Sequence, residues 1–188
     1  MIDLLERNQI IIDRADCKSD KDYLNKQEFF NIISDLIFTE PVQQMKNYRQ
    51  HFNTSCFDHC LEVSYWSFII CKKLHLDYVS MARAALLHDL FLYDWRGSKK
   101  KLHLKRLHAF IHPYIALQNA QKICNINEKE QDIILKHMWP VTFFQFPKYR
   151  ESFIITITDK FSSLNSFRKY ILKKEEKSFL KYQKKLDS

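Results

Sequence analysis

Glycine is almost absent from this chain: the 188 residues include one glycine, Gly97, and four prolines. Tight hairpins and phosphate-binding loops depend on glycine, because it reaches backbone conformations that other residues avoid. The shortage therefore favours helices joined by short polar turns, and it argues against a sandwich, a barrel or a glycine-rich phosphate cradle. Hydrophobic residues make up 46% of the chain, which is enough for a packed core and excludes a disordered chain.

The spacing of apolar residues predicts a chain of helices in a single domain over residues 1–188. The predicted helices span Asp20–Phe38, Pro41–His51, 56–74, Asp77–Leu92, Pro113–Cys124, Asn127–His137 and Arg150–Leu172. Loops are expected at Tyr93–Lys105 and Trp139–Lys148. The β-branched run 154–158 would also suit a strand, but we interpret it as a buried helix face. The fold class expected is all-α.

Six residues with metal-binding side chains lie along the middle of the chain. They are His59, the adjacent pair His88 and Asp89, His112, His137 and Asp159. With His88 and Asp89 counted as one group, successive groups are 22 to 29 positions apart, and each gap is about the length of one helix and its connection. A helical domain could therefore bring all six side chains to one point. Neutral imidazole together with carboxylate favours Fe, Mn, Zn, Ni or Co over Ca²⁺, which takes oxygen ligands only.

The ordered pattern H…HD…D resembles the HD-domain superfamily of metal-dependent phosphohydrolases. Its four elements match His59, His88, Asp89 and Asp159, while His112 and His137 occupy the places of the two extra histidines in members with two metals. The resemblance covers 52–167, with N-terminal helices over 20–51 and a basic tail over 173–188 outside it. The residues Met138-Trp139-Pro140 stand where the cyclic-di-GMP-degrading branch has its GYP signature, which argues against that substrate.

The resemblance implies a helical bundle of HD-domain type that holds two divalent transition-metal ions bridged by Asp89. It also implies a phosphomonoesterase or phosphodiesterase that attacks a small phosphorylated metabolite, such as a nucleotide, with a metal-activated hydroxide. Asp89 and Lys160 are the catalytic candidates. Lys160, Arg83 and His108 are the candidates for binding substrate, and the cations of the 93–105 loop could line the mouth of the site.

The net charge of +8 suits a small anionic substrate. Nucleic acid is a weaker expectation, because no recognition motif accompanies the charge. The N-terminus does not resemble a signal peptide, no apolar run is long enough to cross a membrane, and the five cysteines form no CxxC pair. A cytoplasmic protein with reduced thiols is therefore expected. Cys56 and Cys60, beside His59, offer a thiolate zinc site as a minor alternative. The oligomeric state stays open.

Two other functions remain compatible with the sequence. Some HD-domain proteins with the same six-ligand order are di-iron oxygenases, and the ligand types here allow iron. A regulatory or interaction module that binds metal without turnover is the third interpretation. It is supported only by the basic tail, and the complete set of ligands argues against it.

Overall fold

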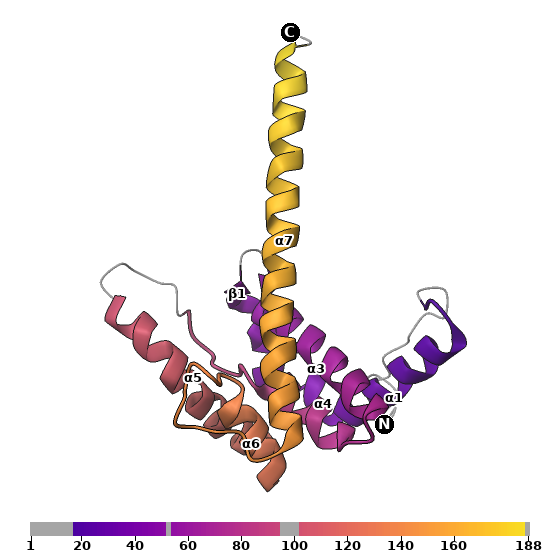
Figure 1. The fold of residues 1–188 in the computed structure, drawn as a ribbon, viewed down its shortest axis with the longest axis vertical. Helices are drawn as coiled ribbons and strands as arrows, with labels where there is room; N and C mark the ends of the chain where they lie inside the picture. Colours follow the sequence, from indigo (N-terminus) through magenta and orange to yellow (C-terminus); the bar gives the residue numbers. More distant parts are fainter. Residues whose placement is uncertain (1–16, 52–53, 95–101, 187–188) are drawn as a thin grey trace, which may run out of the picture.

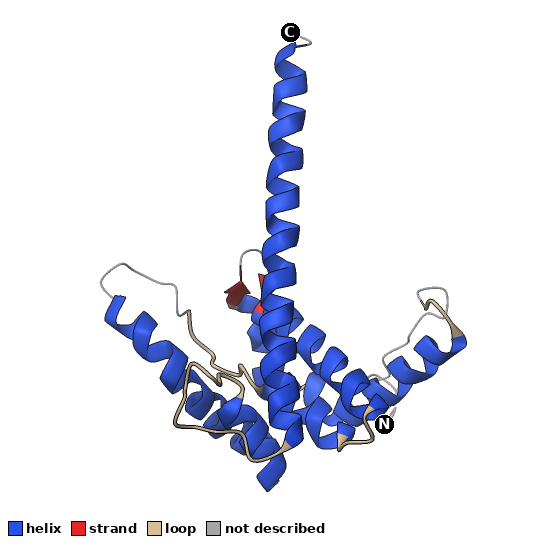
Figure 2. Cartoon of the chain, viewed as in Figure 1, coloured by secondary structure: helices blue, strands red, loops and turns tan. Residues whose placement is uncertain are grey.

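A computed structural model describes residues 17–51, 54–94 and 102–186, and it is almost entirely helical there (Figures 1 and 2). In chain order the elements are α1 (Asp20–Ile37), α2 (Glu40–Gln44), the 3₁₀ helix η3 (Met45–Asn47), β1 (Arg49–His51), β2 (Thr54–Ser55), α3 (Cys56–Lys73), α4 (Tyr78–Leu87), α5 (Leu102–Ile123), α6 (Glu128–Lys136) and α7 (Arg150–Leu186). The all-α expectation is confirmed. Each helix in the described residues is too short or too polar to span a lipid bilayer.

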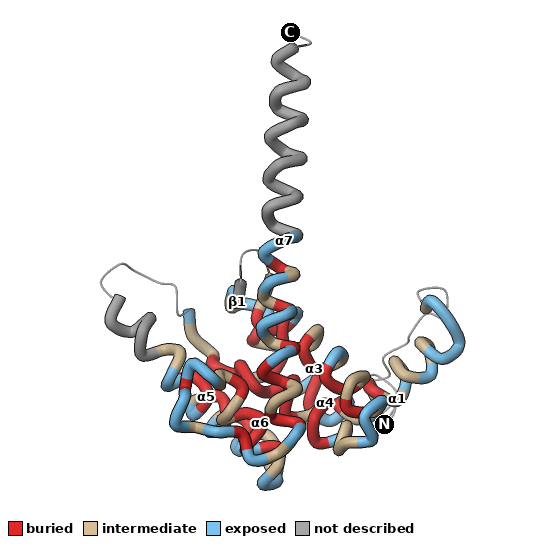
Figure 3. The backbone as a smooth tube through the Cα atoms, in the orientation of Figure 1, coloured by how far each residue is buried: buried red, intermediate tan, exposed pale blue. Residues whose placement is uncertain are grey.

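Helices α3 and α4 form the centre of the core. Ser55 caps the N-terminus of α3 by accepting a hydrogen bond from the backbone N–H of Asp58, which satisfies one of the free donors at a helix start. The buried alanines of α4, Ala82, Ala84 and Ala85, have small side chains that permit close packing against α3. Figure 3 shows the buried backbone concentrated where α3, α4, α6 and the first half of α7 meet.

The region before α3 differs from the prediction. We expected a helix from Pro41 to His51, but the helical part ends at Asn47 and β1 pairs with β2 in a short antiparallel hairpin. Successive side chains of a strand point to opposite faces, and in β1 Arg49 is exposed while Gln50 is buried. This alternation directs Gln50 towards the interior of the molecule.

Helix α4 ends at Leu87, so the predicted helix Asp77–Leu92 was too long and the His88-Asp89 pair lies just beyond the helix. The backbone turns back on itself there, with hydrogen bonds from the N–H of Leu90 to the carbonyl of Leu87 and from Phe91 to Asp89. The side chain of Asn119 on α5 donates to the carbonyl of Leu90. Leaving the helix at this point frees Asp89 to lie in the centre of the site.

Helix α5 begins at Leu102 rather than at Pro113, so the predicted loop Tyr93–Lys105 is shorter and the proline lies inside the helix. A proline in this position removes one backbone donor. Asn127 caps α6 as expected, with a full capping box formed with Glu130.

Helix α7 confirms the helical interpretation of the 154–158 run. Thr156 and Thr158 donate their hydroxyl protons to the carbonyls of Ser152 and Ile154 on the preceding turn, which allows them to be buried in a helix. The helix continues well past the predicted end at Leu172, and its C-terminal part extends beyond the other helices (Figure 1).

Candidate metal centre

The six predicted ligands come together from five parts of the fold. His59 lies in the first turns of α3, His112 on α5 and Asp159 on α7. His88 and His137 are the C-cap residues of α4 and α6, where a side chain can turn away from the helix axis. All four histidines and Asp89 are buried. Two groups of three have ligand atoms close enough to hold a metal ion: His59, His88, Asp89 and Asp89, His112, His137.

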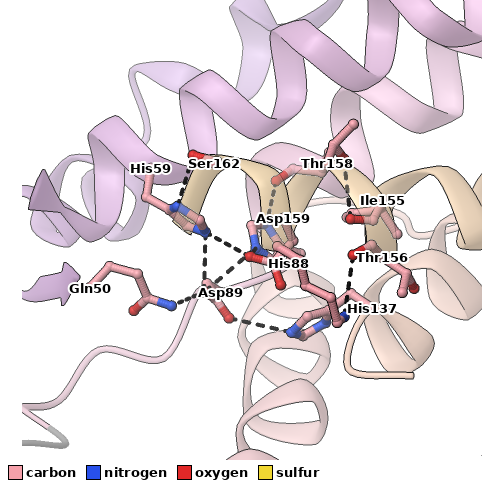
Figure 4. A network of polar contacts seen from close by, with 12 residues as sticks. Gln50, His59, His88, Asp89, His137, Ile155, Thr156, Thr158, Asp159 and Ser162 are labelled. Carbon is pink, nitrogen blue, oxygen red and sulfur yellow. Dashed lines mark hydrogen bonds and ion pairs between the residues drawn. The ribbon is translucent and has the colours of Figure 1, made fainter. Parts of the chain in front are cut away.

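Asp89 is shared by both groups and lies at their centre (Figure 4). Its Oδ2 is 3.5 Å from Nε2 of His88 and 4.0 Å from Nε2 of His59. Its Oδ1 is 3.2 Å from Nε2 of His112 and 3.6 Å from Nε2 of His137. Each carboxylate oxygen therefore faces a different pair of histidines. Asp159 joins the first pair, with Oδ1 at 3.0 Å from Nε2 of His59.

Hydrogen bonds on the far side of each ring fix the tautomer of three histidines. The Nδ1 atoms of His88, His112 and His137 lie 2.7, 2.8 and 2.7 Å from the backbone carbonyls of Ala85, His108 and Ile134. A carbonyl only accepts, so each Nδ1 carries the proton. In the neutral ring Nε2 is then unprotonated, and it presents its lone pair to the cluster. This is the arrangement that orients histidine ligands in metal proteins.

The fourth histidine, His59, is oriented by a side chain. Ser162 on α7 donates its proton to Glu62, so its oxygen can accept from Nδ1 of His59 at 3.4 Å. Nε2 of His59 faces Asp159 and the cluster, and in the metal-free protein it donates a hydrogen bond to Asp159, whose charge raises the pKa of His59 against the effect of burial.

A cation at the centre of the cluster would stabilise several of its atoms. Nε2 of His112 and Nε2 of His137 are 2.8 Å apart, and two nitrogen lone pairs cannot stay at that distance without a proton or a metal ion between them or beside them. Within the described part of the chain, Nε2 of His88 and Oδ1 of Asp89 are buried without a hydrogen-bond partner, and such groups are costly unless something satisfies them. The donor set and its unsatisfied atoms therefore fit a buried transition-metal site.

The net effect of burial and of the charges of the cluster is to lower the pKa values of both carboxylates and of His137. Burial alone would raise the pKa of Asp159, but the hydrogen bond from His59 and the charges of the nearby histidines lower it to about 2. The histidines likewise hold the pKa of Asp89 well below its usual range against the effect of burial. Burial, followed by the charges of His112 and His88, lowers the pKa of His137 to about 3. Both carboxylates are thus ionised and His137 is neutral near pH 7, as metal binding requires.

The lowered pKa of His137 predicts acid sensitivity in the metal-free protein. The unfolded chain protonates this residue near pH 6.5, but the folded chain does so only near pH 3. Its contribution to stability is therefore complete above pH 6.5 and is lost as the pH falls from 6.5 towards 3. Between pH 7.5 and 5.0, metal-free wild type should lose about 2 kcal/mol more of its unfolding free energy than His137→Gln. Denaturant titration of both proteins measures this difference, and parallel pH profiles would contradict it.

The predicted substrate-binding residues are placed differently from one another. The Lys160 ammonium lies 2.9 Å from the carbonyl oxygen of Trp139 and 3.2 Å from that of Thr156. Lys160 follows the predicted ligand Asp159 in sequence. His108 stacks on His112 with ring centroids 4.6 Å apart, and its Nδ1 lies 2.8 Å from the hydroxyl of Tyr93. His108 therefore lies beside the cluster, whereas Lys160 is an exposed residue one position after Asp159.

Arg83 is placed elsewhere. Its guanidinium lies 2.7 Å from Asp35 on α1 and 3.3 Å from Glu130 on α6. These contacts tie α4 to its neighbours and give the residue a structural role, so its position does not support the predicted contact with substrate. The loop cations Arg96 and Lys99–Lys101 lie outside the described residues.

The thiolate alternative is not supported by the surroundings of the cysteines. Cys56 donates its thiol proton to the backbone carbonyl of Asp89 at 3.2 Å, and burial raises the pKa of the Cys60 thiol well above its usual value. Thiols are metal ligands only when deprotonated. Neither cysteine belongs to the two ligand groups found among the described residues.

One polar contact to Asp89 was not foreseen from the sequence. The side-chain amide of Gln50, on β1, donates a hydrogen bond to Oδ2 of Asp89 (Figure 4). The only signal for it would have been strand alternation in a segment that we predicted to be helical. No family model, curated protein or solved structure matches this chain.

Proposed function

We propose that this chain is a metal-dependent phosphohydrolase of the HD type. It acts as a phosphomonoesterase or phosphodiesterase on a small phosphorylated metabolite, with a nucleotide as the best candidate. The observation that carries the proposal is the position of Asp89, whose two oxygens face two separate pairs of histidines. The ordered H…HD…H…H…D motif supports the same conclusion.

We infer two ions rather than one. His59, His88 and Asp159 would hold the first ion and His112 and His137 the second, with Asp89 between them. When bound, divalent ions supply the chemistry of such a reaction, because they lower the pKa of water and polarise a phosphate oxygen. The protein itself orients the ligands through the backbone carbonyls at each histidine. It also excludes bulk water from a site in which Asp89 is 2% exposed.

Lys160 is proposed to contact the phosphate of the substrate. An ammonium group has three donors, and within the described chain two of them point to the carbonyls of Trp139 and Thr156. That leaves one donor for an anion. Partial burial lowers the pKa of Lys160, but the residue is exposed, so an anion in solution could reach its remaining donor.

Replacing Lys160 by alanine should raise KM or lower kcat by about tenfold while the metal content stays at the wild-type level, because the change removes a cation but no ligand. Lys148→Ala is the matched control. It removes the same charge from a lysine whose ammonium is near the exposed Glu128, and it should leave both constants unchanged. Steady-state kinetics and elemental analysis on the same preparations measure these effects. Unchanged kinetics for Lys160→Ala would show that this lysine does not contact the substrate.

A substrate panel tests the function. Protein of known metal content is assayed with phosphomonoesters, nucleotides and phosphodiesters, and phosphate or alcohol release is expected from at least one class. Dioxygen consumption by the Fe(II)-loaded protein is measured in parallel. Oxygen-dependent turnover without hydrolysis would favour the di-iron oxygenase, and metal binding without any turnover would favour a regulatory module.

A further inference from the structure

Gln50 contacts Asp89, the residue shared by both proposed ion sites. It is 7% exposed on the inner face of β1, and its amide donates to Oδ2 of Asp89. The strand is held in place by its pairing with β2, which leads directly into α3 and His59. The amide is therefore anchored by the same hairpin that begins the helix carrying a predicted ligand.

The orientation of the Asp89 carboxylate matters because its two oxygens face different pairs of histidines. Oδ2 faces His59 and His88, while Oδ1 faces His112 and His137. Rotation of the carboxylate about its terminal torsion is soft in an unconstrained aspartate. A rotation would move both oxygens out of line with the two histidine pairs, so the bridging arrangement needs a group that holds one oxygen in place.

We propose that Gln50 is the positioning residue that holds Asp89 in its bridging orientation. This inference rests on the proposed metal centre. The backbone of Asp89 is fixed separately, by the thiol of Cys56 at its carbonyl oxygen, so Gln50 acts on the side chain alone. A carboxylate oxygen can accept a hydrogen bond and still bind an ion, since each oxygen has two lone pairs.

A neutral amide suits this role better than a charged group. A lysine or arginine in its place would neutralise the Asp89 carboxylate and compete with the metal cation. A glutamate would repel the Asp89 carboxylate. The amide offers a directed hydrogen bond without changing the net charge of the site. Partners of this kind behind a metal ligand typically contribute 10- to 100-fold in metal affinity.

The test replaces Gln50 by methionine, which has a similar length and no donor. Metal-free protein is titrated with Mn²⁺, and binding is followed by calorimetry and by the electron paramagnetic resonance signal of coupled ions. We expect the first ion to bind almost as in the wild type, because it has four side-chain ligands. The second ion, with three, should bind about 10- to 100-fold more weakly, and the signal from coupling through the bridge should be lost.

Thr54→Val is the matched control, because Thr54 is a polar residue in the same hairpin whose hydroxyl bonds to Ser166 on α7 instead. It should bind both ions and keep the coupled signal. If Gln50→Met is unstable, Gln50→Asn replaces it, since the shorter amide cannot span the same distance. Wild-type binding of both ions with an intact coupled signal in the Gln50 variant would overturn the inference. A wild-type protein that binds no metal would instead refute the centre itself.

Discussion

We expect Asp89→Ala to remove both the proposed bound metal and the proposed hydrolytic activity, the largest effect of any single substitution. The side chain is the one shared by both groups of ligands, so its loss deprives each ion of a donor. Changing a residue behind a metal ligand already costs 10- to 100-fold, and removal of a direct, shared ligand should lower kcat/KM at least about a hundredfold. Elemental analysis and kinetics on the same preparation measure the two losses.

Asp132→Ala separates this effect from a general loss of structure. Asp132 is also a buried carboxylate, but it accepts hydrogen bonds from Ser152 and from the backbone of Lys148 outside the cluster. Its replacement should lower stability while the metal content per folded chain is kept. A folded Asp89→Ala protein with full hydrolytic activity would refute the proposed mechanism.

Metal binding should stabilise the folded protein strongly. The Nε2 atoms of His112 and His137 are 2.8 Å apart, and a cation removes the repulsion that two lone pairs at this distance would otherwise cause. An ion that binds only the folded state stabilises it by about 4 kcal/mol when present at a thousandfold excess over its Kd. For a chain of this size that raises Tm by about 8 to 16 °C.

Thermal unfolding of chelator-treated protein, with and without added Mn²⁺ or Zn²⁺, measures this shift. Mg²⁺ at the same concentration should have a much smaller effect, because it prefers oxygen ligands and retains its water. Asp89→Ala should respond weakly to every ion. A wild-type Tm that does not change with any transition metal would contradict a buried metal centre.

The sequence predicted which histidines and aspartates cluster better than it predicted the segments that carry them. The intervals between His59, His88, His112 and His137 match the length of one helix and its connection. The scarcity of glycine independently favoured a helical fold. The predicted helix Asn127–His137 ends within one residue of α6, whose C-cap is His137. The C-cap position of His88 could not be predicted, because the apolar run continues past the end of α4 into the buried Leu90 and Phe91. Periodicity cannot locate a helix end when the residues after it are also buried.

The hairpin was missed for a different reason. Its strands are very short, and its segment contains no glycine that would signal a turn. Its stability comes from packing against η3, α3 and α7, and such tertiary contacts override local propensity. The contact between Gln50 and Asp89 spans distant parts of the chain, so no local pattern could reveal it.

The metal-to-protein ratio is the most direct test of a two-ion centre in this protein. Wild-type protein is purified without chelator, incubated with Mn²⁺ or Fe²⁺, freed of loose ions by gel filtration and analysed for its elements. For a two-ion centre, we expect a ratio approaching two ions per chain. A ratio of one that does not rise with added metal would restrict the centre to His59, His88, Asp89 and Asp159. A folded protein that retains no transition metal would contradict the claim.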